Sequence, residues 1–141
     1  MTEERQLLLQ DLCARSLYGV VVEIRGSYED GEKYIRESEF DHSMIGYVYD
    51  EDVSIKPYLR PMSSMTEEEK RELHGRYNVC LDEILNTLIL REHSKGYWDE
   101  DTECSFVDYL WFIDWLNAHH FDYRGLIEKG LALEAPDGMY K

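Results

Sequence analysis

The segment from Glu103 to His119 is apolar on nearly every side, and this feature most limits how the chain can fold. Its length and composition predict a helix whose main polar breaks are Asp108 and Asp114. The apolar side chains around it are Phe106, Val107, Leu110, Trp111, Phe112, Ile113, Trp115 and Leu116. Such a helix lies in the centre of a core or between subunits. We therefore expect a folded protein, with a homo-oligomer through this helix as one alternative.

The charge of the chain limits its partners. In 141 residues, 30 Asp and Glu stand against 15 Lys and Arg, so the formal net charge is −15. Nucleic acids and anionic lipids bind through basic patches, so direct nucleic-acid binding by the surface as a whole is not expected. The length suits one domain over residues 1–141. Aromatic residues make up 13%, which separates this chain from disordered acidic chains.

The cysteines and the apolar runs indicate a compartment. Cys13, Cys80 and Cys104 are odd in number and widely spaced, so neither a disulfide framework nor a zinc site is predicted. We expect Cys13 and Cys80 to be buried thiols beside apolar helix positions. The N-terminus carries acidic residues where a signal peptide has basic ones, and no run approaches the ~18 apolar residues of a membrane span. A cytoplasmic protein is expected, without a membrane segment.

The first half of the chain predicts one helix followed by strands. Thr2 can cap a helix that ends near Ser16 and buries Leu8 and Leu12, with Cys13 as a further candidate for the buried face. Alternation of apolar and polar residues, clearest in the first segment, then predicts strands over 18–25, 33–40, 45–49 and from 53 onward, with a turn at 29–31. Pro57 either ends the last strand or confines it to a sheet edge. Strands so closely spaced favour antiparallel pairing.

The second half predicts helices. Thr66 and Glu69 form a capping box for a helix that reaches about Arg76, and a further helix is expected from Cys80 to His93. A short last helix is expected over 122–130, followed by a turn at 136–138. The fold class is therefore α+β: an N-terminal helix, a small antiparallel sheet of three or four strands, and C-terminal helices packed on one face.

No stretch carries a complete metal or catalytic motif. The acidic run Asp99, Asp101 and Glu103 resembles the start of a calcium loop, but that loop requires Gly at position six and Glu at position twelve. We expect no metal and no cofactor, and a protein that is not an enzyme. The alternative is a hydrolase-like enzyme with a site around His119, His120 and Asp122. A histidine near a helix C-terminus also has a simpler role against the helix dipole.

A protein partner is the expectation that remains, with a basic protein as one alternative. The acidic surface serves solubility, or it imitates a nucleic-acid backbone toward a basic protein. The candidate partner-binding residues gather around the apolar helix and its C-terminal end: Trp111, Trp115, His119, His120, Tyr123 and Arg124. Aromatic and arginine side chains often anchor interfaces, but they also anchor the edge of a core, which we prefer for residues 119–124.

Three stretches of the chain carry a resemblance to known sequences. The stretches are Lys56-Pro-Tyr-Leu-Arg-Pro-Met-Ser-Ser-Met-Thr-Glu-Glu-Glu69, Asp114-Trp-Leu-Asn-Ala-His-His-Phe-Asp-Tyr-Arg-Gly-Leu-Ile-Glu-Lys-Gly-Leu-Ala-Leu-Glu-Ala-Pro-Asp-Gly-Met-Tyr140 and, more loosely, Leu8-Leu-Gln-Asp-Leu-Cys-Ala-Arg-Ser-Leu-Tyr-Gly-Val20. They resemble short proteins of gut Bacteroidales and of the phages or prophages that they carry, in which Leu-Pro-Tyr-Gly-Val often stands where this chain has Ser16-Leu-Tyr-Gly-Val20. The resemblance implies a cytoplasmic protein in a bacterial or phage setting, and it assigns no activity and no catalytic residue. The hypothesis is thus a binding or regulatory protein, specifically a modulator of a nucleic-acid-handling protein.

Overall fold

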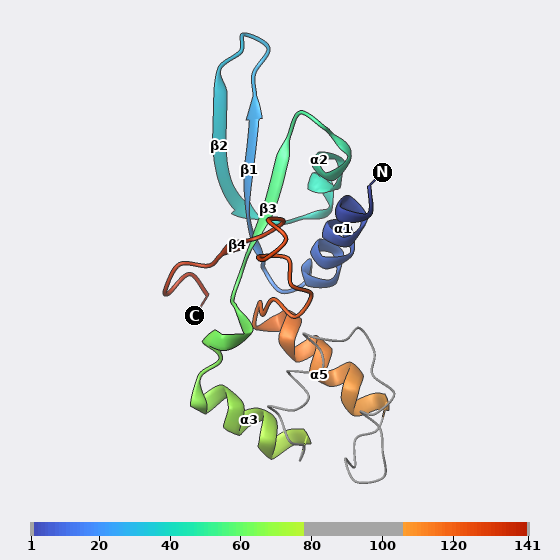
Figure 1. The fold of residues 1–141 in the computed structure, drawn as a ribbon, viewed down its shortest axis with the longest axis vertical. Coiled ribbons are helices and arrows are strands. Elements are labelled where there is room, and N and C mark those ends of the chain that lie inside the picture. Colours follow the sequence, from blue (N-terminus) through green and yellow to red (C-terminus); the bar gives the residue numbers. More distant parts are fainter. Residues whose placement is uncertain (1, 78–105, 141) are drawn as a thin grey trace. The chain divides into compact units, whose positions relative to one another are not determined.

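The computed structural model describes residues 2–77 and 106–140 (Figure 1). The predicted helix from Cys80 to His93 and the acidic run at 99–103 lie outside the described residues. Two compact units are present: unit 1 comprises residues 1–59 and 126–141, and unit 2 comprises residues 60–125. Each has its own cluster of buried apolar side chains. One domain over the whole chain stays a prediction.

Unit 1 begins with helix α1 (Glu3–Arg15), which Thr2 caps as predicted: the Arg5 amide donates to the Thr2 hydroxyl at 3.2 Å. Leu8 and Leu12 are buried, in agreement with the sequence pattern. The expectation of a buried Cys13 is wrong, because its side chain is exposed. Cys13 follows Leu12 by one residue, about 100° around the helix, which turns it away from the buried stripe.

A four-stranded sheet forms the centre of unit 1. The strands are β1 (Val21–Ser27), β2 (Lys33–Glu39), β3 (Ser54–Leu59) and β4 (Leu133–Glu134), in the order β2-β1-β3-β4 (Figure 1). Pairing is antiparallel for β1–β2 and β1–β3, as predicted, whereas β4 pairs in parallel with β3, which the sequence did not indicate. Val22, Ile24 and Ile55 are buried on the face that α1 covers. The α+β class is confirmed.

The strand predicted over 45–49 is wrong, because Ile45–Tyr49 is the short helix α2. Asp41 caps the 3-10 turn His42–Met44, which leads into α2. The Asp41 carboxylate accepts hydrogen bonds from the Ser43 amide at 2.8 Å and from the Ser43 hydroxyl, and these bonds lower the pKa of Asp41. Ile45 and Val48 are three residues apart, a helical spacing that packs both against the core of unit 1. A run of five residues is too short for periodicity alone to separate helix from strand.

Pro57 lies inside β3 and does not end it. It faces Val22 of β1, at a position where the backbone of β3 points away from β1. Its missing N–H therefore costs no hydrogen bond to β1. Neither alternative predicted for Pro57 holds as stated, because β3 continues through Pro57 and lies between β1 and β4 in the sheet.

Unit 2 contains helices α3 (Glu67–Tyr77) and α5 (Phe106–Ala118). The predicted capping box is present, since the Glu69 amide donates to the Thr66 hydroxyl at 3.1 Å and the Thr66 amide donates to the Glu69 carboxylate at 3.0 Å. The buried side chains of this unit are Met65, Leu73, Phe112, Trp115, Leu116, Phe121 and Tyr123.

The helix predicted over 122–130 is wrong, because these residues form successive turns. The Asp122 amide donates to the Arg60 carbonyl at 2.8 Å, in a β-bridge between Arg60 and Phe121. Gly125 and Gly130 have φ values of 74°, which an α-helix does not allow. The predicted turn at 136–138 is confirmed by a hydrogen bond from the Met139 amide to the Pro136 carbonyl.

Candidate functional site

The aromatic residues at the end of α5 pack on one another. Trp115 and His119 are one helical turn apart, and their ring centroids lie 3.9 Å apart in a stacked arrangement. The Phe121 ring lies 5.8 Å from the Trp115 ring, and the Trp115 indole N–H donates to Glu72 at 3.3 Å. Because Trp115 is buried, its ring belongs to the core of unit 2.

His120 ends α5 in a left-handed conformation, with φ at 63°. The His120 amide donates to the Asn117 carbonyl at 3.1 Å, and the Phe121 amide donates to the Leu116 carbonyl at 3.0 Å. These bonds satisfy carbonyl groups that the end of a helix leaves open. His120 is buried. Its place in the fold is therefore to turn the chain out of the helix.

The other two residues of the enzyme alternative also hold this turn. His119 Nδ1 lies 2.9 Å from the Trp115 carbonyl oxygen, and the Asp122 amide takes part in the bridge to Arg60. Asp122 is buried. These contacts supply a structural role for the stretch from His119 to Asp122, and a hydrolase-like site there stays a prediction.

Of the remaining candidate partner-binding residues, Trp111 is the exposed one. Its side chain and that of Leu110 are about half exposed on α5. Tyr123 is buried and donates from its hydroxyl to Asn117 Oδ1 at 2.9 Å, while the Arg124 guanidinium lies 4.8 Å from the Tyr123 ring centre. The six residues thus divide into one exposed tryptophan and a packed cluster.

Arg60 and Glu69 form an ion pair that the sequence reading missed. The guanidinium holds both carboxylate oxygens of Glu69, at 2.8 and 2.6 Å, and lies 4.1 Å from the Phe121 ring centre. Burial opposes ionisation of Glu69, but the hydrogen bonds from Arg60 and Thr66 outweigh it and lower its pKa to about 2. This ion pair joins the start of α3 to the chain around Phe121.

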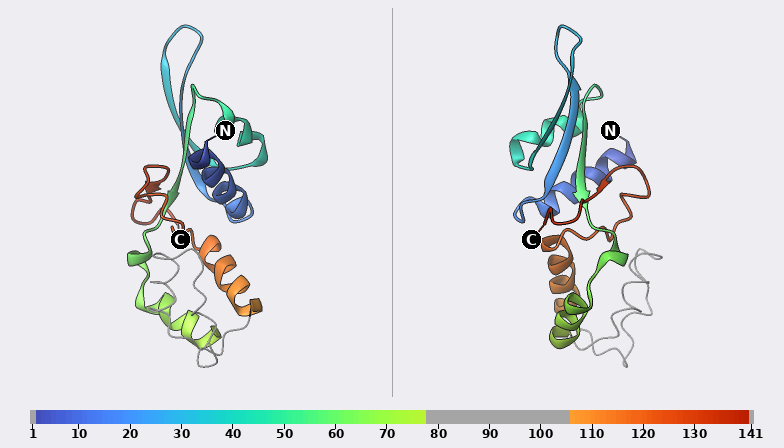
Figure 2. Two further views of the ribbon diagram at one scale, coloured as in Figure 1. Left: turned by 45° about the vertical axis from the view of Figure 1, so that its right-hand side comes forward. Right: turned by 90° about the vertical axis from the view of Figure 1, so that its left-hand side faces the viewer.

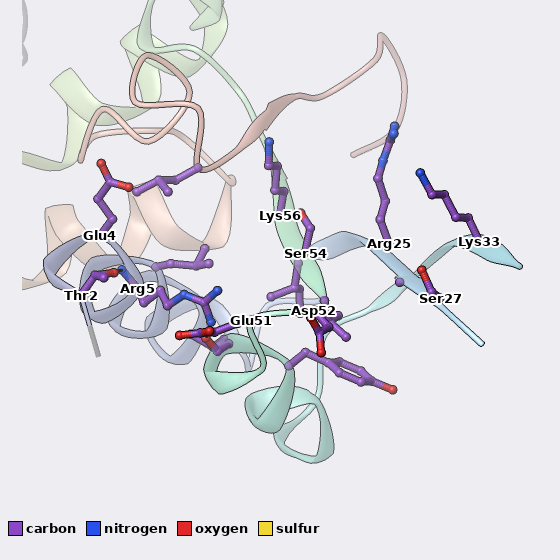
Figure 3. A pocket seen from close by; sticks show the side chains of 17 residues that line it. Thr2, Glu4, Arg5, Arg25, Ser27, Lys33, Glu51, Asp52, Ser54 and Lys56 are labelled. Atoms are coloured by element: carbon purple, nitrogen blue, oxygen red, sulfur yellow. Dashed lines mark hydrogen bonds between the residues drawn. The ribbon is translucent and has the colours of Figure 1, made fainter. Parts of the chain in front are cut away.

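A groove lies in unit 1 (Figure 3), which we call the β3 groove. It encloses about 670 Å³ between the first turns of α1, the end of α2 and the strands. Its apolar lining is Leu8, Val48, Val53, Ile55 and Leu131. Its polar and charged lining is Thr2, Glu4, Arg5, Arg25, Ser27, Lys33, Tyr47, Glu51, Asp52, Ser54 and Lys56. The volume is that of a small-molecule or peptide site.

The register of the sheet shows where backbone groups point along β3. The Phe40 amide donates to the Val20 carbonyl at 2.8 Å, so Val20 and every second residue after it bond to β2. The backbone N–H and C=O groups of Glu23 and Arg25, which lie between those residues, bond to β3. They face Lys56 and Ser54, respectively.

Ile55 lies between Ser54 and Lys56, so its N–H and C=O point away from β1. β4 occupies that edge only beside Tyr58 and Leu59. The N–H and C=O of Ile55 therefore point toward the β3 groove, which Ile55 lines, although the residue as a whole is only 3% exposed.

The charges around the β3 groove are mixed. Arg5 is held in place by a bond from its guanidinium to the Val48 carbonyl at 2.7 Å. Figure 3 shows Lys56, Arg25 and Lys33 pointing in a similar direction on the strand side, with Glu4 and Glu51 on the side of α1. Among the described residues, neither Lys33 nor Lys56 makes an ion pair within 4.0 Å. Both ammonium groups are available to a ligand.

Beside the groove, two glutamates share one tyrosine on the sheet face away from α1. The Tyr58 hydroxyl lies 2.8 Å from Glu37 and 3.3 Å from Glu23, and burial is the main cause that raises its pKa. A hydrogen bond from Arg25 lowers the pKa of Glu23 against the effect of its burial. Tyr58 is thus a neutral donor between two carboxylates at neutral pH.

No known protein family, curated protein or solved structure matches this chain. Within residues 2–77 and 106–140, no three His, Cys, Asp or Glu side chains form a metal-binding group. None of the helices described there is both long and apolar enough to cross a membrane. The geometry of the described residues is therefore the basis for a functional proposal.

Proposed function

We propose that this is a small acidic binding protein that acts through protein contacts and takes an extended segment of a partner protein into the β3 groove. The observation that carries the proposal is that the N–H and C=O of Ile55 point away from β1, along a groove with an apolar floor. A peptide that adds a strand to a sheet edge gains main-chain hydrogen bonds there, and the pockets beside the edge select its side chains.

The chain already uses this edge for strand addition. Residues Leu133 and Glu134 of β4 pair in parallel with Tyr58 and Leu59, and the Ala135 amide donates to the Leu59 carbonyl at 2.8 Å. An incoming strand beside Ile55 would continue along the same edge. Since strand residues alternate in direction, every second side chain of the peptide would point to the apolar floor.

The charge supports a partner whose surface is basic overall. A protein of net charge −15 attracts basic proteins over long range and repels nucleic acid. The exposed thiol of Cys13 suits a reducing compartment, so we place this binding in the cytoplasm. A host or phage protein that handles nucleic acid is a partner with this charge, in the setting that the sequence motifs resemble.

Selection from a library of random linear peptides, followed by hydrogen exchange of the full chain, tests the proposal. The Ile55 amide, which bonds to no neighbouring strand, should exchange at least about tenfold more slowly with a selected peptide bound than in the free protein. The Arg25 amide, which bonds within the sheet, is the internal control.

Two charge variants locate the binding. Lys56→Glu changes the groove, whereas Lys129→Glu makes the same change of net charge at an exposed residue outside it. We expect the affinity of selected peptides to change about tenfold on Lys56→Glu, in the direction set by the charge of the peptide beside it, and to stay unchanged in the Lys129→Glu variant. Equal affinity for both variants, or an Ile55 amide whose exchange does not slow, would overturn the proposal.

A further inference from the structure

β2 is an edge strand whose backbone is directed outward at alternate residues. The Tyr28 amide donates to the Glu32 carbonyl at 2.7 Å, in step with the bond from Phe40 to Val20, so the even-numbered residues of β2 bond to β1. The residues whose N–H and C=O point away from β1 are Lys33, Ile35, Glu37 and Glu39. Such a row is a template for another strand.

The side chains of this strand are also exposed. Ile35 is 61% exposed, which is unusual for a β-branched apolar residue in a regular strand. Both views in Figure 2 show the β1–β2 hairpin extending past α1 and α2, so neither helix of unit 1 covers its tip. The exposed apolar side chain and the open backbone therefore occur on the same strand edge.

We propose that β2 pairs with β2 of a second copy of this chain, antiparallel and centred on Ile35. In this register Ile35 faces Ile35, and Lys33 of each copy faces Glu37 of the other, all on one face of the sheet. On the opposite face Tyr34 of each copy lies across from Arg36 of the other. The two side chains are compatible, because within one copy the Arg36 guanidinium already lies 5.0 Å from the Tyr34 ring centre.

The neighbouring registers are poorer. Centring on Arg36 places the two Arg36 side chains against each other, and centring on Glu37 does the same with two carboxylates. Centring on Tyr34 sets Ile35 against the ammonium group of Lys33. The charge pattern of β2 therefore selects one antiparallel register with a two-fold axis.

The expected association is weak. One pair of seven-residue strands buries less accessible surface than the ~1,200 Å² of a standard protein interface. We therefore expect the dimer to dissociate with a constant on the order of 100 µM. The pairing does not depend on the proposed function, because the strand edges of β2 and β3 lie on opposite sides of β1, although the Lys33 side chain also lines the β3 groove. A result that overturns the β2 pairing therefore does not overturn peptide binding in the β3 groove, and the reverse also holds.

Sedimentation equilibrium of the full chain, with a charge exchange, tests the pairing. Lys33→Glu and Glu37→Lys should each weaken dimerisation at least about tenfold, since each sets two like-charged pairs face to face. The double variant Lys33→Glu/Glu37→Lys exchanges the partners and should restore the wild-type constant. Lys129→Glu changes the net charge as Lys33→Glu does and should leave the constant within about threefold.

An isotopically mixed NMR sample fixes the register. Tyr34 and Arg36 form non-hydrogen-bonded pairs across the proposed contact, where Cα atoms approach to ~4.5 Å, so a nuclear Overhauser effect is expected between their α-protons in different copies. Circular dichroism confirms that each variant is folded. A monomer at all concentrations up to ~1 mM, contacts between other residues, or a double variant that stays as weak as the single ones would overturn the pairing.

Discussion

At the scale of single residues, charged side chains hold this small protein together in two ways. Glu69 is ionised despite its partial burial, because Arg60 and Thr66 donate to it. Asp11 and Arg15 form a fully buried pair one turn apart on α1, with two bonds of 2.9 and 3.1 Å. The first pair makes stability depend on pH, and the second is sensitive to the loss of either partner.

Glu69 should contribute stability that acid removes. Its pKa falls from 4.5 to about 2 on folding, so the unfolded state binds more protons between these values and stability declines as pH falls through them. We expect Glu69→Gln to cost about 2–3 kcal/mol at pH 6 and much less near pH 2. Urea unfolding at several pH values measures this. A cost that does not change with pH would contradict it, and Glu68→Gln, at an exposed neighbour, is the control.

Asp11→Ala should be among the most destabilising substitutions in unit 1. It removes the carboxylate that holds the buried Arg15 guanidinium, and breaking a buried ion pair from one side costs about 3–5 kcal/mol. The double variant Asp11→Leu/Arg15→Met removes both charges and should cost less. The exposed Gln10→Ala should change the free energy of unfolding by under ~0.5 kcal/mol. Chemical denaturation measures the free energy of unfolding of all three variants. A double variant less stable than Asp11→Ala would contradict the role of the buried ion pair.

At the scale of elements, the sequence predicted a helix or strand correctly where its apolar pattern was long or where its cap depended on neighbouring residues. The alternation from Val20 to Ile24 and the Thr66 cap were predicted and are present. The short run 45–49 and the stretch 122–130 were predicted wrongly. There the outcome depends on contacts that a local window does not contain, such as the bridge between Arg60 and Phe121.

The site was less predictable than the elements. The β3 groove is lined by residues from three separate segments, 2–8, 25–33 and 47–56, together with Leu131. None of these residues belongs to a recognisable motif. The candidates read from the sequence were aromatic and histidine side chains near the end of α5, where Trp115 and Tyr123 are buried. Open backbone at a strand edge has no side-chain signature, so composition does not reveal it.

Tyr140 closes the β1–β3 ladder from the other end of the chain. Its hydroxyl accepts from the Val21 amide at 2.9 Å and donates to the Tyr58 carbonyl at 2.7 Å, and burial raises its pKa to about 12. Tyr140→Phe leaves both backbone groups without this partner and should cost about 1–3 kcal/mol in the free energy of unfolding. Thermal or urea unfolding measures it against Tyr49→Phe, an exposed tyrosine, and equal stability of the two variants would contradict the bridging role.

At the scale of the whole molecule, the net charge of −15 and the β3 groove suggest different ways to hold a partner. An imitation of a nucleic-acid backbone holds a basic protein by charge over long distances, and salt weakens it. Strand addition holds a peptide through main-chain hydrogen bonds and apolar contacts at short range, which salt screens far less. The two modes therefore differ in their dependence on ionic strength.

Raising the salt from ~0.1 M to ~1 M shortens the Debye length from ~10 to ~3 Å and separates these modes. A peptide selected for the β3 groove should lose less than about threefold in affinity over this range, because its main bonds are direct contacts with Ile55 and the apolar floor. Contact through the charged surface alone should weaken by orders of magnitude, as multiply charged complexes do. Fluorescence anisotropy with the labelled peptide measures the dependence, and Lys129→Glu again controls for net charge. A steep loss for wild type and control alike would assign the binding to the acidic surface and remove the groove from the account.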